Sequence, residues 1–219
     1  MKVLRFLTCA VISLLPFNRM RIFAYRRLCG YNIDWESYVG ALTLLMARCV
    51  TMRSAKIGAI NVLRLHELDM GPYSSIGKFN HVSRVRCIRL ARSARIKTRN
   101  FIGGTHRSVE ECGREDLILG EHSQLSIGCF IDLSDSINIG NNVVVAGAGT
   151  QMWTHGFNHL RQRSTGPITI ANNVFIGTHS VIVQDVEICS DVVVAGGTVV
   201  HRSITEPGLY ASSQLHKIR

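Results

Sequence analysis

Aliphatic residues recur at every sixth position along much of this chain. From residue 170 to 205, the first position of each hexad is β-branched and the fifth is small or medium-sized. The first positions are Ile170, Ile176, Ile182, Ile188, Val194 and Val200, and the fifth positions are Val174, Ser180, Val186, Val192, Thr198 and Ile204. An earlier block begins at Ile127, with first positions Ile127, Leu133, Ile139 and Val145.

This spacing restricts the fold. Positions one and five are four residues apart, so on an extended strand both side chains point to one face. β-Branched residues suit strands, and the Gly or Ala often found at position two suits a sharp corner. Three hexads close a triangular coil of about 18 residues, and stacked coils pair their strands in parallel. Helical patterns are absent after residue 31, which excludes a doubly wound α/β fold. We therefore predict a parallel β-helix over residues 31–219.

Residues 1–30 have a different pattern. The apolar run from Phe6 to Leu15 is far shorter than the roughly 20 residues that a membrane span needs. No small-residue cleavage site follows it, so a cleaved signal peptide is not expected. Apolar residues instead repeat at helical spacing, both here and after a second helix start at Asn18. We predict two short basic amphipathic helices, which either lie on a membrane surface or cap the β-helix.

The charge is unevenly distributed. Residues 1–109 hold 19 Lys and Arg against 4 Asp and Glu, whereas residues 110–219 hold 6 against 11. Such asymmetry indicates an anionic partner for the N-terminal half: a membrane, phosphates or an acidic glycan. Seven basic residues fall in a run without an intervening acid: Arg84, Arg86, Arg89, Arg92, Arg95, Lys97 and Arg99. Because hexads turn around the coil, this run should spread over several faces, which argues against nucleic-acid binding.

The hexads resemble those of the hexapeptide-repeat acyltransferases, over roughly residues 30–219. The resemblance implies an all-β fold, a left-handed parallel β-helix, here with a short α-helical N-terminal segment. It is closest to the sugar and polysaccharide O-acetyltransferases and the maltose and galactoside acetyltransferases. It further implies a homotrimer, with acetyl-CoA in a groove between neighbouring β-helices and direct acyl transfer in a ternary complex, without a metal.

The period breaks at residues 151–169, and loops extruded from a solenoid often carry function. His155, in Trp-Thr-His-Gly, matches the family's general base. A sugar hydroxyl must lose its proton as it attacks a thioester, and a neutral imidazole suits that task at pH 7. The alternative is an exposed loop histidine without a role. His159 either binds the acceptor or merely decorates the loop.

The resemblance also assigns residues to the acyl donor. Thr178 matches a small residue near the thioester, and Gly196 and Gly197 match small residues beside the pantetheine arm. Arg202 takes the place of a family lysine, and Arg219 lies in a C-terminal segment that resembles the family's ending but lacks its Gly and Pro. A cation beside a CoA phosphate is chemically sensible, and a solvated surface charge is the alternative.

Acceptor residues are harder to identify. Asp132 and Asp135 precede the loop and either hydrogen-bond sugar hydroxyls, orient His155, or simply form a turn. Trp153 and Phe157 either stack on a sugar ring or anchor the loop.

The leading hypothesis is an acetyltransferase that acts on a sugar hydroxyl of a bacterial surface polysaccharide or its precursor. It would work in the cytoplasm, either free or peripheral on the inner face of the membrane. The alternatives are an N-acyltransferase for an amino sugar, a zinc hydro-lyase built from several histidines, and a non-catalytic scaffold. A covalent mechanism through Cys129 or Cys189 is a further alternative. The seven cysteines are irregularly spaced, which favours free thiols in a reducing compartment.

Overall fold

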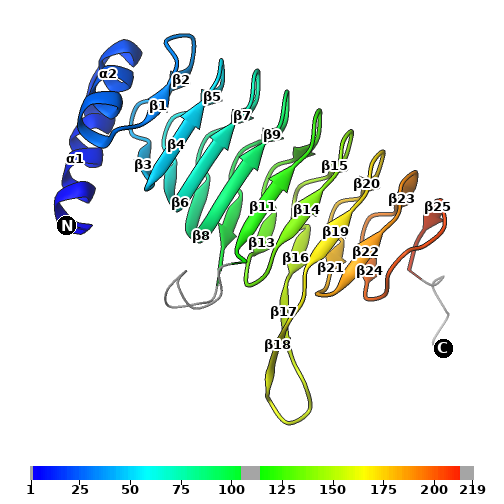
Figure 1. Ribbon diagram of the computed structural model, residues 1–219. Helices are drawn as coiled ribbons and strands as arrows, with labels where there is room; N and C mark the ends of the chain where they lie inside the picture. The colour runs from blue at the N-terminus through cyan, green and yellow to red at the C-terminus, as the bar shows by residue number, and fades with distance from the viewer. Residues whose placement is uncertain (1, 105–113, 213–219) are drawn as a thin grey trace.

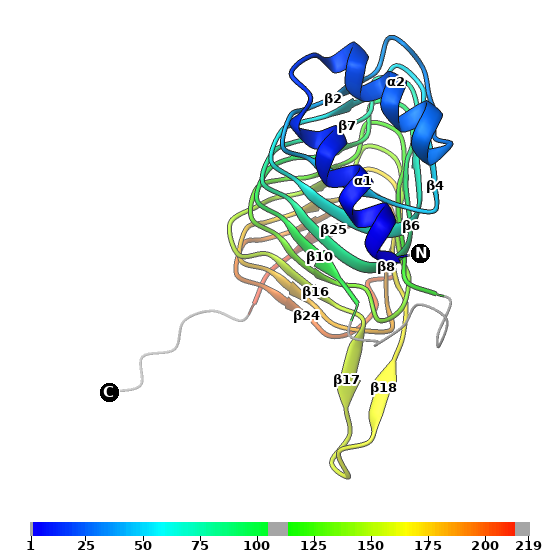
Figure 2. The same ribbon diagram turned by 90° about the vertical axis from the view of Figure 1, so that its left-hand side faces the viewer.

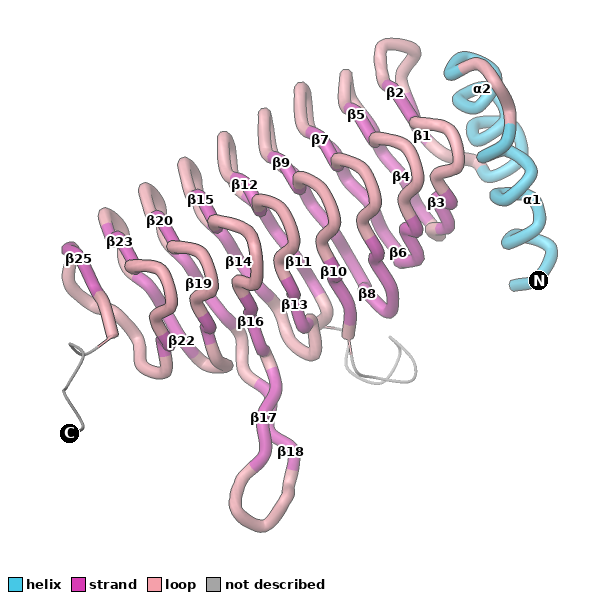
Figure 3. The backbone as a smooth tube through the Cα atoms, turned by 180° about the vertical axis from the view of Figure 1, so that it is seen from behind, coloured by secondary structure: helices cyan, strands magenta, loops and turns pink. Residues whose placement is uncertain are grey.

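The chain folds as a parallel β-helix with two α-helices at its N-terminal end (Figure 1). This computed structural model describes residues 2–104 and 114–212. The helices are α1 (Lys2–Leu14) and α2 (Asn18–Cys29), as the sequence predicted. Figure 3 shows the successive coils stacked from the helices to the C-terminal strand. The fold class predicted from the hexads is therefore confirmed.

Within the described residues, two sheets form the wall of the coil. One holds nine strands, in this order: β2 (Tyr38–Val39), β5 (Lys56–Ile57), β7 (Ser75–Ile76), β9 (Arg95–Ile96), β12 (Gln124–Leu125), β15 (Val144–Val145), β20 (Phe175–Ile176), β23 (Val192–Val194) and β25 (Gly208–Tyr210). The other holds β1 (Asn32–Ile33), β3 (Leu44–Met46), β4 (Cys49–Met52), β6 (Val62–Met70), β8 (His81–Leu90), β10 (Phe101–Gly103), β11 (Asp116–Leu119), β13 (Phe130–Asp132), β14 (Ile137–Ile139), β16 (Gln151–Trp153), β19 (Ile168–Ile170), β21 (Val181–Ile182), β22 (Val186–Ile188) and β24 (Val199–Val200). A separate antiparallel pair consists of β17 (His155–Phe157) and β18 (Arg163–Thr165).

The hexad positions fill the interior. All six first positions and all six fifth positions of the 170–205 block are buried, as predicted. Ile127 is the exception in the earlier block, because it is 51% exposed while Leu125 is fully buried. The prediction for Ile127 was wrong because the repeat changes phase. Ile131 is in register with Ile182, through Met152, and Ile139 is in register with Ile188, through Ile170. Eight residues therefore separate Ile131 and Ile139, where six separate Ile182 and Ile188. The two additional residues lie in the corner at 132–136.

Glycine at the second position is explained by contact between coils. A Cβ on Gly58 would lie 2.5 Å from the carbonyl oxygen of Gly77, and one on Gly177 would lie 2.4 Å from the amide nitrogen of Gly196. Distances this short leave no room for a side chain. The corners of successive coils therefore stack backbone on backbone.

A ladder of buried asparagines links the corners of the N-terminal coils. Asn80 donates to the carbonyl of Lys97 at 2.8 Å, and its own oxygen accepts from the amide of Asn100 at 3.0 Å. Asn61 supports Asn80 in the same way, since its side-chain oxygen accepts from the Asn80 amide at 2.8 Å. These side chains satisfy backbone groups at corners where the strands do not pair, which buried polar groups require.

The two helices close the open N-terminal edge of the coil. Asn18 pairs with the first coil much as a strand would, donating to the carbonyl of Ser37 and accepting from the amide of Val39, both at 2.9 Å. The buried Arg21 donates to the carbonyl of Val39 at 2.8 Å. Edge strands left unpaired invite association, so this cap protects the sheet. Helix α2 ends at Gly30, whose φ of 71° suits a glycine.

The arginine run spreads around the coil as expected, but it is not free of acids. Arg86 contacts Asp116, and Arg89 lies 3.8 Å from Asp69 and 3.9 Å from Glu67. These acids come from the neighbouring coils, so the sequence alone did not show them as neighbours.

We expect Asn80→Ala to lower the free energy of unfolding by about 3 kcal/mol. The substitution leaves the Asn100 amide and the Lys97 carbonyl without partners, and each buried orphan costs about 1–3 kcal/mol. Urea unfolding followed by circular dichroism measures the change. Asn138→Ala is the control, because Asn138 lies on the outer side of β14 and should change stability by no more than about 0.5 kcal/mol. Equal losses in the two variants would contradict the role given to the ladder.

Candidate active site

A hairpin leaves the coil at Thr154 and returns at Ile168. Strands β17 and β18 pair antiparallel, and together they project sideways from the β-helix (Figures 1 and 2). The segments 151–153 and 168–169, which the sequence included in the loop, are parts of sheet strands β16 and β19. The coil cannot lengthen without losing its register with the coils above and below, so the inserted residues extend outward.

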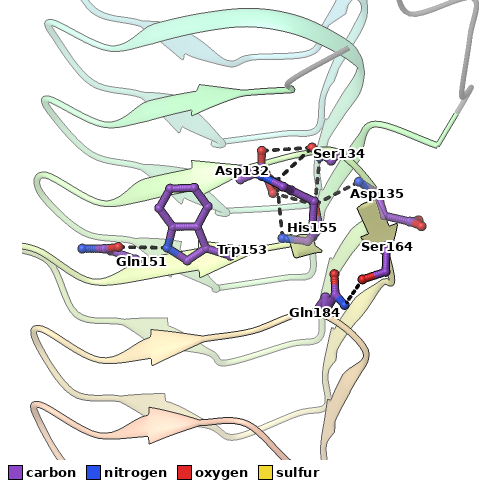
Figure 4. Close-up of polar contacts among 9 residues, drawn as sticks. Asp132, Ser134, Asp135, Gln151, Trp153, His155, Ser164 and Gln184 are labelled. Atoms are coloured by element: carbon purple, nitrogen blue, oxygen red, sulfur yellow. Dashed lines mark hydrogen bonds and ion pairs between the residues drawn. The ribbon is translucent and has the colours of Figure 1, made fainter. Parts of the chain in front are cut away.

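His155 stands at the base of this hairpin, against the side chain of Asp132. Its Nδ1 lies 2.8 Å from Oδ2 of Asp132, and the carboxylate side chain is only 3% exposed (Figure 4). An ionised carboxylate only accepts, so this contact assigns the ring proton to Nδ1 and leaves the lone pair on Nε2. Among the described residues, Nε2 has no hydrogen-bond partner. The imidazole is thus held by a hydrogen bond at Nδ1, while Nε2 can accept a proton from another group.

The Asp132 carboxylate is itself held by two hydroxyls. Ser134 Oγ donates to Oδ1 at 3.0 Å, and Thr154 Oγ1 lies 3.1 Å from Oδ2. Thr154 Oγ1 also accepts from the backbone amides of Ser134 at 2.8 Å and Asp135 at 2.9 Å. The buried hydroxyl of Thr154, the residue before His155, therefore links the hairpin to the corner that contains Ser134 and Asp135. Sequence reasoning missed Ser134 and the contacts of Thr154, and the change of phase at 132–136 was the only signal.

An aromatic ladder leads along the outer face to His155. The rings of His81, Phe101, Phe130 and Trp153 stack on successive coils with centroids 4.9–5.2 Å apart. Trp153 meets His155 edge-on at 5.8 Å, and its Nε1 donates to Gln151 at 2.9 Å (Figure 4). The stacking on Phe130 orients Trp153 and places it beside the imidazole.

Two other predicted acceptor residues are not brought to His155. The Asp135 side chain is 3% exposed, binds the amide of Ser136 at 2.8 Å and lies 3.8 Å from Arg114. It therefore forms a corner and offers nothing to a substrate in this arrangement. His159 lies exposed in the turn of the hairpin, beyond the last pair of β17 and β18.

Gln184 fastens the hairpin to the next coil. Its Nε2 donates to Ser164 Oγ on β18 at 2.7 Å (Figure 4). A Cβ on Gly156 of β17 would lie only 3.3 Å from Gln184 Oε1, so this strand also rests on Gln184. The base of the hairpin, with His155, is held from both sides.

The predicted donor residues gather at a different corner. Gly197 donates its amide to the carbonyl of Thr178 at 2.8 Å, and a Cβ on Gly196 would lie 3.1 Å from the same carbonyl. Arg202 is exposed after β24, while Arg219 lies outside the described residues. Thr178 precedes β21, and Gln184, which holds the base of the hairpin, follows it. The donor corner and His155 therefore lie at opposite ends of one face of the coil.

The cysteine alternative has little geometric support. Cys129 is buried, and burial raises the pKa of its thiol to about 11, so at neutral pH the thiol is protonated. Cys189 is half-buried in a later coil. In the described part of the chain, no three His, Cys, Asp or Glu side chains form a cluster suited to a metal ion.

Comparisons with known proteins gave structural similarities only. No family model matches the sequence, and no curated protein matches it. A hexapeptide-repeat-containing acetyltransferase from Vibrio cholerae aligns over 96% of this chain and 84% of its own, at 17% identity and a TM-score of 0.42. The polysialic acid O-acetyltransferase OatWY aligns over 83% of this chain and 80% of its own, at 17% identity and a TM-score of 0.48. The polysialic acid-specific acetyltransferase NeuO aligns over 84% and 83%, at 16% identity and a TM-score of 0.42. Such identities do not transfer residue roles, so the chemistry has to be derived from the site itself.

We expect Thr154→Val to lower the free energy of unfolding by about 3 kcal/mol. Valine keeps the shape of threonine but leaves the amides of Ser134 and Asp135 without an acceptor, at about 1–3 kcal/mol each. Urea unfolding measures the loss, and Thr154→Ser should recover most of it by restoring the hydroxyl. Thr205→Val, at an exposed position, is the control. A Thr154→Val protein as stable as the parent would show that the hydroxyl does not join the two coils.

Proposed function

We propose that this protein is an acyl-CoA-dependent acyltransferase that moves an acetyl group from acetyl-CoA to a sugar hydroxyl. His155 is the general base of this reaction. The acceptor is a sugar of a bacterial surface polysaccharide or its precursor, and the reaction takes place in the cytoplasm, where acetyl-CoA is available.

The observation that carries the proposal is the contact between Asp132 and His155. An imidazole whose Nδ1 is bound by a buried carboxylate presents Nε2 as a base, and this nitrogen has no partner in the described chain. In the proposed reaction, Nε2 takes the proton of the sugar hydroxyl while its oxygen attacks the thioester carbonyl. The tetrahedral intermediate then collapses, and the CoA sulfur leaves with the proton from the imidazolium.

Asp132 acts through His155 and is a positioning residue. Its carboxylate fixes the tautomer that keeps the Nε2 lone pair available, and it stabilises the imidazolium that forms during transfer. The two hydroxyls on Asp132 keep it in place. Of the roles that the sequence left open for Asp132, the contact favours orientation of His155 over a hydrogen bond to the acceptor.

The donor corner supports a site for acetyl-CoA that is shared between two protomers. Thr178, Gly196 and Gly197 form a smooth corner without large side chains, which suits the close approach of a pantetheine arm. This corner lies before β21, and the hairpin base with His155 lies beside Gln184 after it. A homotrimer, in which the corner of one protomer faces His155 of the next, would complete the site.

Trp153 and the hairpin would bound the acceptor. Trp153 lies beside the imidazole, and His159 and Phe157 are exposed on the hairpin, within reach of an extended glycan. An amino sugar is the second candidate acceptor, since the same base would deprotonate its ammonium group. A panel of sugar and amino-sugar acceptors distinguishes transfer to a hydroxyl from transfer to an amino group.

We expect His155→Asn to lower kcat for acetyl transfer by about 10²–10⁴-fold, with little change in KM for acetyl-CoA. Asp132→Asn should lower kcat at least about 10-fold, because an amide no longer fixes the tautomer. Release of the CoA thiol is measured with a panel of sugars, amino sugars and oligosaccharides, and the product is analysed by mass spectrometry.

His122→Asn is the matched control, because His122 is exposed at a coil corner with a φ of 59°, which asparagine tolerates. Its rate should equal that of the parent. If His155→Asn also retained the parental rate with an acceptor that the parent acetylates, His155 would not be the base. Transfer only to amino groups would replace O-acylation by the N-acyl alternative.

We also expect Arg202→Gln to raise KM for acetyl-CoA about 10- to 150-fold, since a phosphate contact to arginine is worth about 1.5–3 kcal/mol. The matched control is acetyl-dephospho-CoA, which lacks the 3′-phosphate. With this donor, the parent and Arg202→Gln should have the same KM. A similar rise in KM with both donors would place Arg202 away from that phosphate.

A further inference from the structure

The two N-terminal helices bury only one side against the coil. Helix α1 packs through Cys9 and Ile12, and α2 packs through Ile22 and Tyr25, all of which are fully buried. These residues provide the cap that the sequence offered as one alternative. The opposite side of each helix takes no part in this cap.

That opposite side is apolar and exposed on both helices. On α1, Leu4, Leu7, Val11 and Leu14 follow one another at three- and four-residue intervals and are 53–72% exposed. This spacing places them on one stripe. On α2 and just before it, Phe17, Met20 and Phe23 are 45–68% exposed. We call these seven residues the outer apolar face. Exposed apolar side chains gathered in this way mark an interaction surface.

The charges carried by the two helices are of one sign. Arg19 and Arg27 are exposed beside Met20 and Phe23, and neither has an ion-pair partner among the described residues. Acidic residues are absent from residues 1–33. The nearest acids in the sequence, Asp34 and Glu36, bind Ser54 on the second coil.

An aromatic side chain completes the rim. Trp35 is 52% exposed and lines a shallow hollow together with Leu15, Arg19, Met20 and Phe23. The guanidinium of Arg26 lies 5.0 Å above the Trp35 ring. Tryptophan and arginine at the edge of an apolar face are the side chains that suit the boundary between lipid headgroups and acyl chains.

We infer that the outer apolar face docks on the surface of an anionic phospholipid bilayer. Apolar side chains of a surface-lying helix enter the acyl boundary, while arginines contact the anionic headgroups. A protein partner would be expected to bring acids to match the arginines, and a second copy of this chain offers none on the same face. Within the described residues, neither helix is long and apolar enough to cross a membrane, so the contact would be peripheral.

Docking would orient the whole β-helix. The helices lie across one end of the coil (Figures 1 and 2), so the coil axis would stand away from the bilayer. His155 follows β15 in the chain. β15 is the sixth of the nine described strands in its sheet, so at about 4.8 Å per coil it lies about 24 Å from the first strand. The hairpin would therefore work above the membrane surface. The docking inference itself does not depend on the proposed function.

The test is co-sedimentation of the full-length protein with vesicles, either phosphatidylcholine alone or phosphatidylcholine with phosphatidylglycerol. We expect binding to the anionic vesicles, weakened by added salt. Leu7→Glu combined with Val11→Glu should reduce partitioning about 10-fold or more. Arg19→Gln combined with Arg27→Gln should reduce it about 25-fold, since each surface cation contributes about 5-fold.

The matched controls carry the same changes elsewhere. Leu209→Glu alters an exposed leucine at the far end of the coil, and Arg95→Gln with Arg99→Gln removes two charges from exposed positions of a middle coil. Both controls should bind like the parent, and circular dichroism verifies that every variant is folded. Phe23→Glu is a second probe on the other helix. The inference would be overturned by absence of binding to anionic vesicles, by equal losses in the controls, or by light scattering showing a dimer that Leu7→Glu with Val11→Glu dissociates.

Discussion

The backbone hydrogen bonds between stacked coils are the constraint on which this structure depends. Each strand pairs with the strands above and below it in parallel register, so every coil has to follow nearly the same perimeter. A residue added to one coil cannot be absorbed by its neighbours without breaking these bonds. It is accommodated only by enlarging a corner or by leaving the wall altogether. The interior aliphatics and the stacked glycine corners are both consequences of this equal perimeter.

The candidate site lies where two irregularities of the coil meet. The corner at 132–136 holds two additional residues, and the hairpin at 154–167 leaves the wall in the coil directly above, where Trp153 is in register with Asp132. Because these irregularities lie on adjacent coils, a carboxylate from one reaches the imidazole of the other. The regular coils on both sides fix their separation. The repeat itself carries no chemistry, but its regular coils thus position Asp132 and His155, which do carry it.

Much of the fold was predictable because it depends on local spacing. The hexads predicted the buried positions from 170 to 205, and helical spacing predicted both α1 and α2. Ile127 was misplaced because a shift of phase becomes visible only when coils are stacked. The loop pointed to His155 as the candidate base, and orientation of His155 by Asp132 was one of the alternatives that the sequence left open. The linking hydroxyl of Thr154 was not predicted, for the same reason. The acids beside Arg86 and Arg89 likewise come from other coils, at separations of 20 to 30 residues that no local pattern records.

Closing the end of the β-helix explains only half of the N-terminal segment. Asn18 and Arg21 satisfy backbone groups that a preceding coil would otherwise have bound, and Ile12 and Tyr25 cover the end of the apolar interior. Folding requires nothing further of these helices, and a polar outer side would serve the cap equally well and keep the chain soluble. Leucine and phenylalanine on that side are therefore not explained by the stability of the β-helix. Because the charges on both helices are all positive, contact with an anionic surface explains the residues on the outer side better than packing against the coil does.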